Sequence, residues 1–162
     1  MNSSPKRASE PTGKSRRKDV NLDLGTARLM LPYVRSIVTD VVQTQETLEK
    51  LSPEQEALDD TRRNLSWTHR QRRYAVHDEI RKAEENLTTA VSELDALGVK
   101  LADPANGAVD FPTRINGRPA AFTWKLGEEA LHFWHYAGED LRRPIPLDWQ
   151  ATGSMNRYHS EP

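Results

Sequence analysis

Five arginines and one tryptophan lie close together near the middle of the chain, in the segment 61–74, TRRNLSWTHRQRRY, which contains no acidic residue. A guanidinium group can hold a phosphate or a carboxylate through two hydrogen bonds, and an exposed indole can stack on a base of single-stranded RNA. We therefore predict that this segment binds RNA or an acidic protein surface. The predicted binding residues are Arg62, Arg63, Trp67, Arg70, Arg72 and Arg73. The alternative is a solvated helix face in which Trp67 packs across a turn against Leu65 and Tyr74.

A second set of polar residues lies in the C-terminal third, where hydrophobic and polar residues alternate as in a β-strand. A hairpin around Gly127 would place Asp110, Lys125 and His132 on one face of a sheet, together with Thr123. A histidine near a carboxylate can act as a general base. Asp110, Lys125 and His132 are therefore the candidate catalytic residues.

Other sequence features weaken the case for an enzyme. The chain has no nucleophile elbow, no phosphate-binding loop and no helix motif with paired metal ligands. His132 and His135 are three residues apart, so a regular strand would point them to opposite faces, where they cannot bind one metal ion. A helix would instead bring them to one face. We expect neither a metal nor a cofactor, and we favour a noncatalytic protein.

Composition sets further limits on the protein. The chain has 162 residues, of which 36% are hydrophobic and 29% are charged, so the apolar residues must form stripes to build a core. Cysteine is absent, which excludes disulfides, thiolate metal ligands and a cysteine nucleophile. No apolar run approaches the roughly 20 residues that cross a bilayer, and the first residues lack the apolar segment of a signal peptide. We therefore expect a cytoplasmic protein.

The first 21 residues have the composition of a disordered basic tail, with six basic side chains against two acidic ones and almost nothing to bury. Residues 1–21 are either a basic arm for RNA, DNA or an acidic partner, or a solubilising leader. The net charge of the whole chain is only -1. A basic tail and a basic segment 61–74 therefore leave a strongly acidic remainder.

Residues 22–98 have the pattern of two long helices. Apolar or near-apolar residues recur at alternating steps of four and three, as in a coiled coil. The first series is Met30, Val34, Ile37, Val41, Thr44, Leu48 and Leu51; the second is Val76, Ile80, Ala83, Leu87, Ala90, Leu94 and Leu97. Asp23 is placed to cap the first helix, and Gly98 is placed to end the second.

The two helices are predicted to form an antiparallel hairpin, because the residue numbers of facing pairs such as Leu58 and Val76 then add to a nearly constant value. This register places the tip near residues 65–68. The run at 52–55, Ser-Pro-Glu-Gln, has the sequence of a new helix start, but a reversal there would bury charged residues. We therefore expect only a kink or a short break at Pro53.

Residues 99–150 are predicted to form a small β module packed on the base of the hairpin. Asn116-Gly117 is a strong signal for a two-residue hairpin turn, which pairs Phe111 with Phe122. The hairpin around Gly127 would pair Trp124 with Phe133 and complete a three-stranded antiparallel meander. Its inward face would carry Val109, Phe111, Phe122, Trp124, Leu131 and Phe133. The predicted fold class is α+β, and residues 151–162 are expected to be a frayed tail.

Several motifs support a family resemblance. They are LPYVR at 31–35, LGV at 97–99, VDFP at 109–112, WKLGE at 124–128 and FWH at 133–135. The chain resembles the domain-of-unknown-function 2203 family of prokaryotic proteins over roughly residues 22–146. That family usually has a cysteine immediately before the tryptophan of the WKLGE-like motif, where this chain has Thr123. The resemblance implies no particular activity.

These features favour a noncatalytic interaction protein that presents the basic tip of a helical hairpin to nucleic acid or to an acidic protein surface. One alternative is a small enzyme that uses the polar face of the β meander, with Asp110, Lys125 and His132. Another is a homo-oligomeric structural protein, in which the exposed sides of the hairpin pair with a second copy. The sequence leaves the oligomeric state open.

Overall fold

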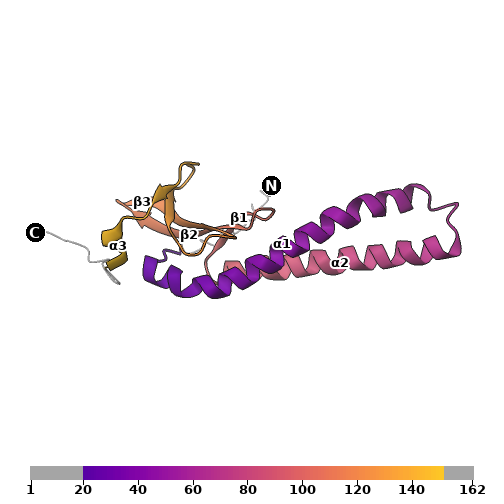
Figure 1. The fold of residues 1–162 in the computed structure, drawn as a ribbon, viewed down its shortest axis with the longest axis horizontal. Helices are drawn as coiled ribbons and strands as arrows, with labels where there is room; N and C mark the ends of the chain where they lie inside the picture. Colours follow the sequence, from indigo (N-terminus) through magenta and orange to yellow (C-terminus); the bar gives the residue numbers. More distant parts are fainter. Residues whose placement is uncertain (1–19, 152–162) are drawn as a thin grey trace, which may run out of the picture.

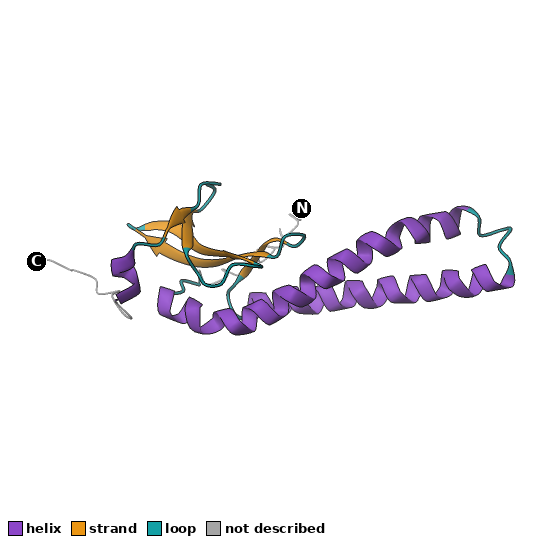
Figure 2. Ribbon diagram, viewed as in Figure 1, coloured by secondary structure: helices purple, strands orange, loops and turns teal. Residues whose placement is uncertain are grey.

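The computed structural model describes residues 20–151. Two long helices run side by side and are joined by a loop at one end of the molecule, while a β-sheet covers the other end of the helical pair (Figures 1 and 2). The expected α+β class is confirmed, with a helical hairpin followed by an antiparallel sheet. Most of the two predicted tails, 1–21 and 151–162, lies outside the described residues.

The first helix, α1 (Leu24–Asp60), begins directly after the predicted cap Asp23. It continues past Pro53, where a kink or a short break was expected. The carboxylate of Asp23 caps the helix by accepting the backbone N–H of Thr26 at 2.7 Å. The helix then passes through Pro53 without interruption, so the short break expected there is absent.

Packing explains why α1 continues through Pro53. Proline cannot donate the helical hydrogen bond of its position, which weakens the helix locally. Leu51 before the proline and Leu58 after it both pack with Val76 and Ile80 of the second helix. These apolar contacts on both sides of the proline offset the missing hydrogen bond, and they bring Leu58 and Val76 into one cluster as the register predicts.

The second helix, α2 (Trp67–Ala96), begins after a loop at residues 61–66. The chain therefore reverses a few residues before the predicted tip at 65–68 and well after Pro53. Ser66 caps α2 by accepting the N–H of His69 at 3.4 Å. At the other end Gly98 adopts a left-handed backbone (φ +77°), and Val99 donates to the Leu94 carbonyl at 2.9 Å. This is the glycine-dependent helix end that the sequence predicts.

The sheet has five antiparallel strands in sequence order, not the three that were expected. The strands are β1 (Lys100–Asp103), β2 (Ala108–Ile115), β3 (Arg118–Lys125), β4 (Phe133–Tyr136) and β5 (Arg143–Pro144), and a short helix, α3 (Leu147–Ala151), follows. β1 and β5 are the strands that were missed. They have four and two residues, too few for an alternating pattern to be recognised.

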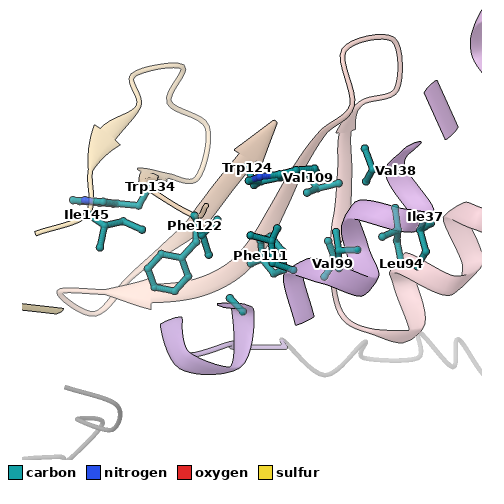
Figure 3. Packing of buried hydrophobic residues seen from close by; sticks show 14 of the residues in the cluster. Ile37, Val38, Leu94, Val99, Val109, Phe111, Phe122, Trp124, Trp134 and Ile145 are labelled. Atoms are coloured by element: carbon teal, nitrogen blue, oxygen red, sulfur yellow. The ribbon is translucent and has the colours of Figure 1, made fainter. Parts of the chain in front are cut away.

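One face of the sheet packs on the base of the hairpin. Val34, Val38 and Val41 of α1 have no exposed surface, and neither have Phe111 and Trp124 of the sheet. All five belong to one hydrophobic cluster, part of which is shown in Figure 3. The β module is therefore fixed to the half of the hairpin that is remote from the tip.

The first hairpin of the sheet has the predicted register. Asn116 and Gly117 form the turn with positive φ angles of 53° and 71°. Phe111 lies opposite Phe122, and both side chains are buried.

The next hairpin is displaced by one residue from its expected register. Phe133 lies opposite Thr123, and Trp134 lies opposite Phe122, whereas the prediction paired Phe133 with Trp124. A shift of one residue moves every side chain of a strand to the other face. Trp134 therefore points into the core and is 8% exposed, while Phe133 lies on the outer face instead of the predicted inner one.

The loop between β3 and β4 causes this displacement. Residues 126–132 form no strand, so the connection is longer than the tight turn that was expected. Glu128 holds the loop: its carboxylate accepts the N–H of Lys125 at 3.0 Å, and its carbonyl accepts the indole N–H of Trp124 at 3.0 Å. Spacing rules for tight hairpins do not apply to such a loop.

The junction between the β module and α1 can be tested at Gly107, in the turn between β1 and β2. Gly107 has a left-handed backbone (φ +66°), and an added Cβ would lie 2.8 Å from Leu126 Cβ, 2.9 Å from Val38 Cγ1 and 3.0 Å from Val42 Cγ2, the last two on α1. An added Cβ at Gly117 (φ +71°) would meet nothing within 4 Å. Because both alanines strain the backbone and only one overpacks α1, Gly107→Ala should lower the free energy of unfolding by about 1–3 kcal/mol more than Gly117→Ala.

Urea denaturation of the two glycine variants measures this difference. Equal losses of stability would contradict the close packing of the Gly107 turn against α1.

Candidate functional site

The hairpin tip consists of the loop 61–66 and the first turns of α2. Leu65 is buried, and its carbonyl accepts a hydrogen bond from Arg70 Nε at 3.1 Å. Trp67 and Tyr74, in contrast, are 72% and 67% exposed. Because these two residues are seven positions apart, they lie on the same side of α2. Because both aromatic side chains are so exposed, Trp67 is not packed across the turn against Leu65 and Tyr74, as the alternative required.

Acidic side chains neutralise two of the predicted binding arginines. Arg72 donates two hydrogen bonds to the Glu54 carboxylate, at 2.6 and 2.9 Å, and its Nη1 lies 3.3 Å from Glu79 Oε1. Arg73 Nε donates to Asp59 Oδ1 at 2.7 Å. The hydrogen bond from Arg72 lowers the pKa of Glu54, and the same contact raises the pKa of Arg72. Arg72 and Arg73 therefore tie the two helices together near the tip.

Three arginines keep their charge available for a partner. Arg62 and Arg63 are exposed, and within the described part of the chain neither has an ion-pair partner. Arg70 is also exposed, and its Nε bonds to a neutral carbonyl rather than to an acid. Together with the two exposed aromatic residues they form a surface that we call the tip patch. Its members are Arg62, Arg63, Trp67, Arg70 and Tyr74.

Behind the tip patch lies a hydrogen-bonded group that was not predicted. His77 Nε2 lies 3.0 Å from Asp59 Oδ1, and His77 Nδ1 lies 3.0 Å from Gln55 Nε2. Hydrogen bonds from His77 and Arg73 lower the pKa of Asp59. The rule for facing pairs sets residues 55–59 opposite 75–79, a range that includes His77, so this rule is the sequence signal that would have found the group.

The outer face of the sheet carries Asp110, and the strand register keeps Lys125 on the same face, two residues along β3 from Thr123, which lies opposite Asp110. Lys125 is exposed at the end of β3, and His132 is exposed in the loop that precedes β4. The one-residue shift of β4 brings His135 to Asp110 instead, with His135 Nε2 3.2 Å from Asp110 Oδ1. The histidine of this pair is therefore His135 and not His132.

Both ring nitrogens of His135 face hydrogen-bond acceptors. Nε2 faces Asp110, and Nδ1 lies 2.8 Å from the carbonyl of Tyr136. Both nitrogens can donate only when the ring is doubly protonated. Burial opposes the charged ring, but the Tyr136 carbonyl and Asp110 outweigh it and raise the pKa of His135. A ring whose protons are both held in this way stabilises the sheet and is poorly suited to act as a general base.

Arg142 covers the neighbouring part of the outer face. Its guanidinium lies 4.3 Å from the centre of the Phe133 ring and 2.7 Å from Glu128 Oε1. Thr123 is 7% exposed on the same face. The outer face is thus a packed arrangement of an ion pair and a cation–π contact.

Within residues 20–151 no three histidine, aspartate or glutamate side chains are grouped so that they could hold a metal ion. No helix in the same range is both long enough and apolar enough to cross a membrane.

The pairing of His135 predicts a pH dependence of stability. Because the pKa of His135 is higher in the folded than in the unfolded protein, its proton stabilises the fold fully below about pH 6.5, and this contribution is lost as the pH rises through the folded-state pKa. The stability difference between wild type and His135→Gln should therefore be largest at low pH and shrink toward alkaline pH. Urea denaturation across about pH 5.5–9 measures it.

The variant His132→Gln is the control for this measurement, since the side chain of His132 is exposed. It should leave the pH dependence of wild type unchanged. If the pH dependence disappeared in His132→Gln and persisted in His135→Gln, His132 and not His135 would be the partner of Asp110. The expected pairing of Phe133 with Trp124 would then be correct.

Comparison with known proteins identifies the family and nothing more specific. The model of one family, described as "Uncharacterized conserved protein (DUF2203)", matches residues 22–145. No curated protein and no solved structure matches the chain. Residues 22–145 span the helical hairpin and all five strands of the sheet. The chain therefore belongs to the domain-of-unknown-function 2203 family.

Proposed function

We propose that this protein is a noncatalytic interaction protein whose tip patch binds an acidic surface of another protein. The observation that carries the proposal is the exposure of Trp67 and Tyr74 beside three arginines, at the end of the hairpin that is remote from the sheet (Figure 1). Tryptophan, tyrosine and arginine are the residues that most often supply the binding energy of protein interfaces.

The length of the hairpin supports this role. The last buried residue of α1 in the cluster that joins it to the sheet is Val41, and α1 continues to Asp60. At about 1.5 Å per residue, the helix extends roughly 28 Å beyond the supported part. A tip patch held at this distance can enter a recess of a partner while the β module stays outside.

Local charge favours a protein partner over RNA. Glu54, Asp59 and Glu79 neutralise the other two arginines of the segment, which leaves three arginines with free charge. Nucleic-acid binding usually depends on many phosphate contacts. Trp67 still offers a stacking surface for a base, so single-stranded RNA is the second candidate. The Asp110–His135 pair gives no comparable support to the alternative of a small enzyme.

Two double variants separate local recognition from overall charge. Arg62→Gln with Arg63→Gln removes arginines that have no acidic partner, whereas Arg72→Gln with Arg73→Gln removes two that are paired. Both changes lower the net charge equally. The Arg62/Arg63 variant should lose most of its binding and keep a nearly unchanged free energy of unfolding. The Arg72/Arg73 variant should lose more free energy of unfolding than free energy of binding. Trp67→Ala should cost about 2 kcal/mol or more of binding energy.

Full-length wild type and variants are used to capture partners from native lysate, with and without nuclease, and the affinity of the captured partner is then titrated. Circular dichroism checks that each variant keeps its helices. Binding that disappears after nuclease treatment would replace the protein partner with RNA. Equal capture by wild type, Trp67→Ala and the Arg62/Arg63 variant would refute the proposal.

A further inference from the structure

A groove runs along one side of the hairpin between α1 and α2. It encloses about 670 Å³, and the buried side chains of Ile37, Ala83 and Ala90 form its floor. The groove lies between the part of the hairpin that carries the sheet and the part that carries the tip patch. It is wide and open, and its length suits an extended peptide segment.

The walls of the groove carry acidic charge that the described residues leave unbalanced. Asp40 and Glu93 line the groove, and within residues 20–151 neither has an ion-pair partner. Lys82 also lines it, but its ammonium group lies 3.0 Å from Asp78. Glu93 stands near the C-terminal end of α2, whose last turn has no basic residue. The helix dipole is negative at that end, so it adds to the potential that attracts a cation.

The N-terminal part of the described chain lies at the end of α2 that carries Glu93. Val20 packs against Gly98, since an added Cβ on Gly98 would lie 2.5 Å from Val20 Cγ1. Leu22 fixes this approach by donating its N–H to the Pro112 carbonyl at 2.7 Å. Glu93 precedes Gly98 by about one and a half helical turns on the groove side of α2. The chain before Val20 therefore starts at the sheet end of the groove.

The residues before Val20 have the charge and the length to fill it. The sequence KSRRK occupies positions 14–18. Lys14 is six residues from Val20, so an extended chain brings it about 20 Å along α2, which equals roughly 13 helical residues. That distance passes Glu93 and reaches the middle of the groove.

We propose that residues 14–18 bind in the groove of their own hairpin, with their basic side chains on Asp40 and Glu93. A second copy of the hairpin is a poor occupant, because its acidic walls would repel those of the first. In this arrangement the basic segment 14–18 lies between the two helices that carry the tip patch. This proposal stands independently of the tip patch and its partner.

The absence of cysteine from the chain allows a direct test by disulfide trapping. One full-length variant combines Ser15→Cys with Thr89→Cys, on the groove wall. Its control combines Ser15→Cys with Thr88→Cys, one residue away and about 100° around α2, on a side that does not line the groove. The two threonines are well matched: each is exposed and donates its hydroxyl to the carbonyl four residues earlier at 3.0 Å.

Under mild oxidation the Thr89 pair should form an intramolecular disulfide at least about ten times faster than the Thr88 pair, because docking raises the local concentration of the thiol. Replacing Lys14, Arg16, Arg17 and Lys18 by Gln, or adding about 0.5 M salt, should remove the difference. Circular dichroism confirms that both variants fold. Equal rates for the two pairs would overturn the proposal, and so would a product that runs as a disulfide-linked dimer, since a second copy would then be the occupant.

Discussion

The structure depends on the burial of one face of the first half of α1 beneath the β-sheet. Val34, Val38 and Val41 lose all their exposed surface there, and each fully buried aliphatic side chain contributes about 1.5–3 kcal/mol. Arg35 reinforces the joint, because its guanidinium lies 5.7 Å from the centre of the Trp124 ring and donates to the carbonyl of Glu129 at 2.7 Å. This joint determines the direction in which the hairpin leaves the sheet, and therefore where the tip patch stands.

Beyond this joint the hairpin must hold itself together with far fewer buried groups. The distal cluster has only three buried residues in the described chain, namely Leu51, Val76 and Ile80. Ion pairs such as Arg72 with Glu54 add little, since exposed pairs contribute about 0–1 kcal/mol each. Because the stability of the tip is local, the tip can fray or adapt to a partner while the base remains folded.

The sequence allowed correct predictions at most positions where a local rule determines the structure, and the uninterrupted helix at Pro53 is the exception. Helical periodicity and facing-pair arithmetic placed the two helices, and the requirement for positive φ identified Gly98 and the Asn116-Gly117 turn. Prediction failed where a loop held by side chains replaces a tight turn. The carboxylate of Glu128 fixes the loop 126–132, and the resulting shift of one residue exchanged His132 for His135 beside Asp110.

The charge of the candidate site on the hairpin differs from the expected one for a related reason. Segment 61–74 contains no acid, so its arginines looked equally available, but the acids that neutralise Arg72 and Arg73 come from the facing turns of α1 and from a position two turns further along α2. Counting charge within a segment ignores neighbours that folding supplies. The exposure of Trp67, in contrast, could not be derived from any local rule, because it depends on the inward turn of Leu65.

The groove and the weak packing of the distal half have one cause. Thr44 and Ala83 occupy positions of the helical seam between the two hydrophobic clusters, and both side chains line the groove. They satisfy the periodicity of a coiled coil, yet they bury much less apolar area than leucine would at the same positions. The sequence therefore forgoes stability at the point where the groove opens. Proteins commonly accept such a loss at surfaces that bind a ligand, which makes a purely structural role for these small residues the weaker explanation.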